Sequence, residues 1–192
     1  MSLRVMLVDR DPERAELLEL ALAEAGHRII ARIGDDVGLA AQVAKLQPDV
    51  IVIDMEAPGR DTLEQMREIA RDRPKPIILF SDERDPAYIR QAVQAGVSAY
   101  VVDGLSRDRV MPIVEVAVAR FLEFQSLRQE LEDTKTQLAD RKIIEKAKGL
   151  LMKKKHMDED QAYQFLRKTA MSRNLKLTEV ARVLVSLEET LL

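Results

Sequence analysis

The first 105 residues alternate between short runs of β-branched and aliphatic residues and longer segments in which apolar residues recur every three or four positions. The short runs predict strands and the longer segments predict helices. This alternation is typical of βαβ units, which wind a parallel sheet and cover both of its faces with helices. We therefore predict an α/β fold, a flavodoxin-like doubly wound domain with a five-stranded parallel sheet. The predicted strands are 4–8, 29–33, 50–53, 77–80 and 99–102.

Helix boundaries in this region are indicated by capping residues. Asp11 is followed by Pro12, which is typical of an N-cap with proline at the first helical position. Glycine just after an apolar periodic segment favours the end of a helix. We expect helix starts at Asp11, Asp61, Asp85 and Ser106 or Asp108, and helix ends at Gly26 and Gly96.

Acidic side chains collect where the predicted strands end. Asp9 and Asp11 follow the first strand, Asp54 ends the third, and Ser81 ends the fourth. Because ligands of such sheets bind outside the carboxyl ends of the strands, we expect these groups to converge on one functional edge. The plain alternative is that the acids only cap surface helices and form no pocket.

Four motifs at this edge together resemble the receiver domain of two-component response regulators. They are V-D-R-D-P at 8–12, I-D-M-E-A-P-G at 53–59, F-S at 80–81 and A-G-V-S-A-Y-V-V-D-G at 95–104. The resemblance implies a receiver-like domain over residues 1–122. It also implies that Asp54 is the phosphoacceptor, that Asp9, Asp11 and Asp54 form an acidic pocket for Mg²⁺, and that Ser81 and Tyr100 are switch residues.

Two positions depart from the receiver pattern. Arg10 stands where a second acid would ligate the metal, and Asp103 stands where the family has a lysine. Mg²⁺ prefers oxygen ligands, and a phosphoryl group beside Asp103 would meet repulsion. Arg10 could instead supply a guanidinium that neutralises the pocket acids without metal. We expect a receiver that is not switched by phosphorylation; the alternative keeps Mg²⁺ and phosphorylation at Asp54.

Residues 106–155 contain no strong helix-breaking signal apart from Pro112 and Gly149, so we predict one long helix. Part of it, residues 113–140, has the three-four spacing of a coiled coil, which favours a parallel homodimer. The alternative is an intramolecular helical hairpin against the C-terminal helices. The seam residues are Ala117, Phe124, Leu127, Leu131, Thr134 and Leu138.

The end of this helix is basic on one face and apolar on the other. Residues 141–176 carry a net charge of about +7 in a chain whose total is −3. An exposed positive face opposite a packed one favours a polyanionic partner, although a merely solvated charged face is the bland alternative.

The chain has no cysteine and two histidines, so disulfides and Cys- or His-built metal centres are not expected.

The last fifty or so residues predict a small three-helix bundle over 138–192. A second helix begins at the acids 158–160 and would bury Ala162, Tyr163, Leu166 and Ala170, while a third begins near Leu177 and would bury Val180, Val183, Leu184 and Leu187. His156 is expected in the turn. No membrane span or signal peptide is apparent, so we expect a cytoplasmic protein. The sequence shows no set of catalytic residues, so we do not expect an enzyme.

The motif I-E-K-A-K-G-L-L-M at 144–152, with A-Y at 162–163, L-R at 166–167, A-M at 170–171 and V-A at 180–181, resembles the ANTAR domain of AmiR- and NasR-type antiterminators. The two halves together resemble the NasT subgroup of nitrate/nitrite-responsive antiterminators. This implies binding of paired stem-loops in leader mRNA, which prevents terminator formation, and restraint by a nitrate-sensing inhibitory protein. The expected RNA-binding residues are Arg141, Lys142, Lys146, Lys148, Gly149, Lys153, Lys155, Tyr163, Arg167 and Arg173.

Two other functions are alternatives to RNA binding. One is a DNA-binding response regulator controlled by phosphorylation of Asp54. Such a regulator would need several base-reading side chains on its recognition helix, but the last predicted helix of this chain is acidic and apolar, with Arg182 as its one base. The other is a phosphotransfer protein whose helical tail docks a protein. Tyr163 could stack on a base or lie in the core, and Gly149 could allow close approach of RNA or of another helix.

Overall fold

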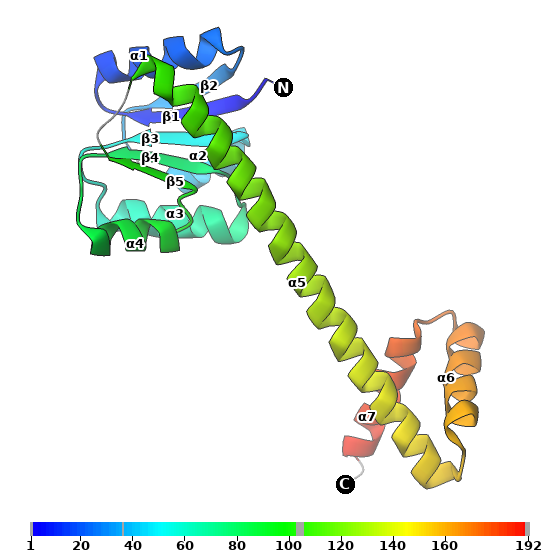
Figure 1. Ribbon diagram of the computed structural model, residues 1–192. Coiled ribbons are helices and arrows are strands. Elements are labelled where there is room, and N and C mark those ends of the chain that lie inside the picture. The colour runs from blue at the N-terminus through cyan, green and yellow to red at the C-terminus, as the bar shows by residue number, and fades with distance from the viewer. Residues whose placement is uncertain (1, 36, 103–105, 191–192) are drawn as a thin grey trace. The chain divides into compact units, whose positions relative to one another are not determined.

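The computed structural model describes residues 2–35, 37–102 and 106–190. The chain divides into two compact units, Met1–Gln125 and Ser126–Leu192, which are coloured blue to green and green to red in Figure 1. The first unit contains the sheet and the second contains the C-terminal helices. Asp103 lies outside the described residues, so its predicted place in the receiver pocket stays a prediction.

The first unit is a five-stranded parallel sheet in the order β2-β1-β3-β4-β5. This order confirms the predicted flavodoxin-like doubly wound fold. The strands are β1 Arg4–Asp9, β2 Arg28–Ile33, β3 Val50–Asp54, β4 Ile77–Ser81 and β5 Ala99–Val102, and the helices are α1 Pro12–Glu24, α2 Leu39–Leu46, α3 Arg60–Asp72, α4 Pro86–Gln94 and the start of α5 Arg107–Lys155.

Helices cover both faces of this sheet (Figure 1). On one face, α1 and the start of α5 pack with residues such as Leu18 and Val114; on the other, α2, α3 and α4 pack with residues such as Val43 and Met66. The central strands β3 and β4 are buried along their whole length. This explains their uninterrupted apolar sequences, since a strand covered on both sides has no solvent face.

Helix α1 starts as the sequence predicted. Asp11 is its N-cap, and Asp11 Oδ1 accepts a hydrogen bond from the backbone N–H of Glu13 at 2.9 Å. Asp85 caps α4 in the same way. The prediction for Asp61 was wrong: the N-cap of α3 is Gly59, and Asp61 lies in the first turn, where its charge still suits the helix dipole.

Helix α5 runs without a break from Arg107 to Lys155, with Pro112 inside it. Ala117 is fully buried in the core of the first unit, so its assignment to the coiled-coil seam was wrong. The seam leucines and phenylalanine from Phe124 to Leu138 are each more than half exposed in this chain. No helical hairpin covers them within the described residues.

The second unit contains the end of α5, α6 Glu159–Arg173 and α7 Leu177–Thr190. Asp158 and Gln161 form a capping box at the start of α6, and His156 adopts the left-handed conformation, with φ of 51°, in the turn before it. The buried core residues are Ala147, Leu151, Ala162, Leu166, Ala170, Val180, Ala181 and Val185.

Three residues that were predicted to be buried in this bundle are exposed. Tyr163 is 40% exposed, and Val183 and Leu187 are both more than half exposed. On α7 the buried stripe follows Val180, Ala181 and Val185. At 100° per residue, Val183 lies on the side of α7 turned away from this stripe, whereas Leu187 lies just past the edge of the stripe, about 20° from Val180.

Gly96 provides a test of the fold. It follows α4 with φ of +99°, and an added Cβ would lie 2.4 Å from Ala70 Cβ on α3. We expect Gly96→Ala to lower the free energy of unfolding by about 2–4 kcal/mol, from backbone strain and from a clash of the added Cβ with Ala70 on α3. Urea denaturation measures this.

The matched control is Gly26→Ala, which ends α1 at φ of +80° with no atom within 4 Å of the added Cβ. It carries the backbone strain alone and should cost about 1–2 kcal/mol. Equal losses in the two variants would contradict the clash between residue 96 and Ala70.

Candidate functional site

The acidic residues predicted from the sequence come together at the carboxyl edge of the sheet in the first unit. β1 and β3 are neighbours, and their register pairs Asp9 directly with Asp54. Both residues are buried. They line a surface pocket of about 680 Å³ together with Arg10, Asp11 and Arg14. The prediction that these side chains converge on one edge is therefore correct.

The guanidinium of Arg14 pairs with Asp54 through both carboxylate oxygens. Arg14 Nε donates to Asp54 Oδ2 at 2.8 Å, and Arg14 Nη2 donates to Asp54 Oδ1 at 2.6 Å. The side chain of Asp54 is 2% exposed and that of Arg14 is 33% exposed. This bidentate pair is the strongest geometry that a carboxylate and a guanidinium can form.

Sequence reasoning assigned the pocket guanidinium to Arg10 and missed Arg14. Arg10 is exposed and lines the pocket, whereas Arg14 reaches Asp54, the predicted phosphoacceptor. Arg14 sits in the first turn of α1, where the helix dipole disfavours a cation by roughly 0.3–1 kcal/mol. This unfavourable position was the sequence signal that could have pointed to Arg14, because a cation at a helix start needs a nearby acid to offset the helix dipole.

Burial governs the ionisation of the two pocket carboxyls. It raises the pKa of Asp54 to about 6; the Arg14 guanidinium opposes this rise and the nearby charge of Asp9 adds to it. Burial also raises the pKa of Asp9. Asp9 Oδ1 accepts from the backbone N–H of Asp11 at 2.8 Å, while Asp9 Oδ2 is buried and has no hydrogen-bond partner among the described residues.

The hydroxyls beside the pocket are held by backbone groups. Ser81 Oγ donates to the carbonyl of Glu56 at 2.9 Å and accepts from the backbone N–H of Glu83 at 3.2 Å. Tyr100 Oη donates to the carbonyl of Glu83 at 2.9 Å, and the Tyr100 ring packs edge-on against Tyr88. The two predicted switch residues are thus hydrogen-bonded to Glu83 in the loop that follows β4, and Ser81 also to Glu56 in the segment that follows β3.

The receiver resemblance implies Mg²⁺, but the residues do not fit this ion as they are arranged. Both oxygens of Asp54 are engaged by Arg14, and the carboxylate of Asp11 caps α1. Asp9 Oδ2 is left as the one buried carboxylate oxygen in the described pocket without a partner. No cluster of three or more ligating side chains occurs in the described ranges. Mg²⁺ needs a near-octahedral oxygen shell, which this arrangement does not offer.

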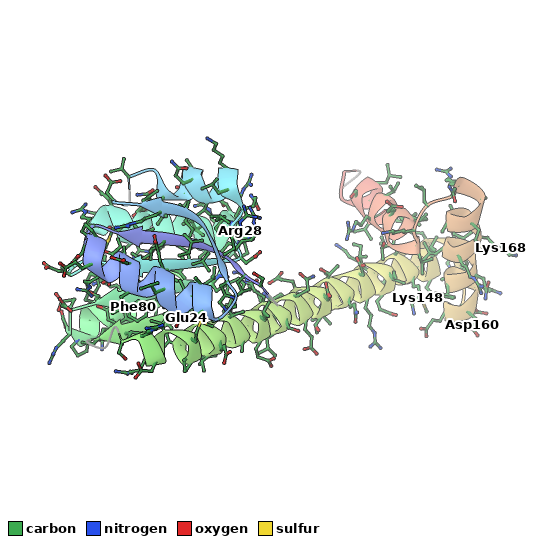
Figure 2. The ribbon with its side chains drawn as sticks, turned by 90° about the horizontal axis from the view of Figure 1, so that it is seen from above. Glu24, Arg28, Phe80, Lys148, Asp160 and Lys168 are labelled. Atoms are coloured by element: carbon green, nitrogen blue, oxygen red, sulfur yellow. The ribbon has the colours of Figure 1, made fainter. Side chains whose placement is uncertain are left out.

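Most of the predicted RNA-binding residues lie on the surface of the second unit. Helices α5 and α6 carry them, and Figure 2 labels a further exposed base of α6, Lys168. Gly149 is half-buried, and an added Cβ would meet nothing within 4 Å, so close packing of a helix does not require this glycine. The exposed predicted residues are Arg141, Lys142, Lys146, Lys153, Lys155, Tyr163, Arg167 and Arg173.

Lys148 is the exception, and its prediction as an exposed basic residue was wrong. Its side chain is only 9% exposed, and Lys148 Nζ lies 2.6 Å from Glu159 Oε1 and 2.8 Å from Glu145 Oε1. These hydrogen bonds raise the pKa of Lys148, with the larger effect from Glu145 and the smaller from Glu159. Lys148, which Figure 2 labels on α5, therefore joins this helix to Glu159 at the start of α6. The acidic residues in the first turn of α6 were the sequence signal that could have predicted this pairing, because they offer carboxylates to a nearby lysine.

Aromatic groups adjoin the basic surface. Tyr163 is 40% exposed on α6, and Lys155 Nζ lies 4.8 Å from the centre of the Phe165 ring, within range of a cation–π contact. The surface thus combines cations with aromatic rings, a combination that suits single-stranded nucleic acid.

Among the described helices, none is both long and apolar enough to span a bilayer.

The raised pKa of Asp54 gives a pH prediction. Because its folded-state pKa of about 6 exceeds the ordinary value of 3.8, the folded chain holds this proton more tightly than the unfolded chain. Its contribution to stability is present below about pH 4 and is lost as pH rises through about 6. The free energy of unfolding of Asp54→Asn should therefore rise relative to wild type across this window. Urea denaturation at stepped pH measures it, and a difference that stays constant with pH would contradict the raised pKa.

Comparison with known proteins agrees with both units. The chain matches the response regulator receiver domain family over residues 5–115 and the ANTAR domain family over residues 132–185. Its first unit resembles the receiver domain of the response regulator NarL from Mycobacterium tuberculosis, with a TM-score of 0.55 and 22% identity over 62% of this chain and 97% of that one. That likeness supports the fold.

Two relatives extend the comparison to transcriptional control. The transcriptional regulatory protein PdtaR of Mycobacterium tuberculosis is 34% identical over 173 residues, which cover 90% of this chain and 83% of that protein. The nitrate regulatory protein of Klebsiella oxytoca is 46% identical over 66 residues, 34% of this chain and 17% of that protein. The chain belongs to the response regulators that combine a receiver domain with an ANTAR domain.

Proposed function

We propose that this protein is a transcription antiterminator that binds paired stem-loops in leader mRNA and so prevents the terminator from forming. The observation that carries this proposal is the exposed basic surface of α5 and α6, which lies in the part of the chain that matches the ANTAR domain. The proposed phosphate contacts are Arg141, Lys142, Lys146, Lys153, Lys155, Arg167 and Arg173, which leaves out the buried Lys148.

The two kinds of side chain on this surface would do different work. Lysine and arginine side chains contact phosphates, which gives affinity that falls with salt and carries little sequence information. Loop bases are unstacked and can lie against an aromatic ring, so Tyr163 is the proposed stacking residue. Its exposure makes it available for this role. A protein acting on nascent transcripts in this way would work in the cytoplasm.

A parallel homodimer would bring two such surfaces to a pair of stem-loops. Phe124, Leu127, Leu131 and Leu138 follow coiled-coil spacing on α5 and are each more than half exposed. A second copy of the helix would cover this apolar seam by knobs-into-holes packing. The proposed dimer therefore removes a row of apolar side chains from water, which is the usual driving force for such association.

Control by nitrate or nitrite, through an inhibitory sensor protein, is the proposed input. The similarity to a nitrate regulatory protein over 66 residues supports it, as does an Asp54 carboxylate already paired with Arg14. The second candidate, a DNA-binding regulator controlled by phosphorylation of Asp54, has less support. Arg182 is the base on the last helix, and it pairs with Asp140 at 3.0 Å, so α7 offers few side chains that could read a base pair.

RNA binding can be tested by fluorescence anisotropy with a labelled two-stem-loop leader RNA over a range of salt concentrations. We expect Arg167→Gln to weaken binding and to reduce the slope of log affinity against log salt by roughly 0.7–0.9, because one phosphate contact is lost. Lys148→Met should leave this slope unchanged, because Lys148 is paired with Glu145 and Glu159 within the protein.

Arg90→Gln on α4 is the charge control, since it removes one exposed positive charge from the first unit. It should leave both affinity and slope as in wild type. Equal loss in Arg90→Gln and Arg167→Gln would mean that the effect is one of net charge. Tighter binding to duplex DNA than to the stem-loop RNA would instead favour the promoter-binding candidate.

The dimer can be tested by sedimentation equilibrium of the full chain. Leu131→Glu places a charge in the apolar seam and should weaken self-association at least tenfold, because the buried charge would be desolvated without a partner. Leu122 is also exposed on α5 but falls outside the seam spacing, so Leu122→Glu should associate like wild type. A wild type that stays monomeric at high concentration would rule out this dimer.

A further inference from the structure

We propose that the Arg14 guanidinium is a built-in cation that takes the place of a divalent metal ion in the receiver pocket and excludes such ions from it. The proposal stands whether or not the second unit binds RNA. It concerns the pocket formed by Asp9, Asp54 and Arg14 at the carboxyl edge of the sheet.

The geometry of the ion pair is the first support. Arg14 uses two donors, Nε and Nη2, at 2.8 Å and 2.6 Å, so each oxygen of Asp54 already has a positively charged partner. A cation that approached these oxygens would meet the guanidinium at close range in a site where Asp54 is 2% exposed. Repulsion between like charges is weakly screened in such buried surroundings.

The backbone around Arg14 is the second support. Asp11 caps α1 by accepting from the N–H groups of Glu13 and Arg14, and Pro12 sets the first helical residue. These contacts hold the first turn of α1, from which the side chain of Arg14 projects. A guanidinium held on a rigid turn loses less conformational freedom when it pairs, which favours a lasting contact with Asp54.

Asp9 is the third support. Its Oδ2 is buried and has no hydrogen-bond partner among the described residues, although it lies beside Asp54 in the strand register. Removal of the Arg14 side chain would leave two neighbouring carboxylates without a positive charge between them. Oxygen ligands of this kind are those that Mg²⁺ and Mn²⁺ prefer. Arg14 is thus the cation that occupies the Asp54 oxygens which such an ion would need.

The hydroxyl and aromatic groups around the pocket agree with a pocket held in one arrangement. Ser81 donates to the carbonyl of Glu56, and Tyr100 donates to the carbonyl of Glu83. Neither side chain needs a bound ion or phosphoryl group to complete these hydrogen bonds. The organised state of the pocket is therefore reached with the protein's own charges.

Mn²⁺ binding to the full-length chain, followed by electron paramagnetic resonance of the free ion, tests the proposal. We expect Arg14→Ala to bind one Mn²⁺ at least tenfold more tightly than wild type. Arg60→Ala is the matched control, because Arg60 also lines the pocket and its loss changes the net charge equally. The double variant Arg14→Ala/Asp54→Asn should lose the gain, since Asp54 would supply an oxygen ligand.

Three outcomes would overturn the proposal. They are an Arg14→Ala variant that binds Mn²⁺ no more tightly than wild type, an equal gain in Arg60→Ala, and a gain that persists in the double variant. Circular dichroism confirms that each variant is folded. If Arg14→Ala does not fold, Arg14→Met retains an apolar side chain of similar reach without the charge, and the same tenfold gain is expected of it.

Discussion

A carboxylate buried at the end of β3 requires a positive partner, and the first unit is arranged around that requirement. Asp54 lies beside Asp9 because β1 and β3 are adjacent parallel strands, so two acids share one poorly solvated edge. Burial of unpaired charges would be costly. The start of α1 supplies Arg14 to this edge, and the cap at Asp11 places the helix turn that carries it.

The second unit follows the same physical rule. The side chain of Lys148 is 9% exposed, and its ammonium group is paired with Glu145 on its own helix and Glu159 on the next. In both units, a charged residue that the sequence alone offered to an outside partner is instead satisfied within the protein. Other cations of α5 and α6, such as Arg141, Lys153 and Arg167, lie at the surface, where a polyanion could reach them.

These two arrangements shape the proposed regulation. A receiver pocket whose acid is paired with its own guanidinium has less need of a metal ion or phosphoryl group to reach an ordered state. Its input is then more naturally a protein bound at the surface than chemistry at Asp54. An exposed apolar seam on α5 and a basic surface after it would transmit that input to RNA through the association of two chains.

The sequence by itself determined the strands, their parallel winding, the caps at Asp11 and Asp85, and the unbroken α5, because hydrophobic periodicity and capping act over a few neighbouring residues. Only the tertiary structure decided which charges meet. Arg14 and Asp54 are 40 positions apart, and Lys148 and Glu159 belong to different helices. The orientation of Val183 and Leu187 was decided there too, since the packing of α7 selects its buried stripe. Side-chain pairing depends on where whole elements dock, and local pattern does not specify this.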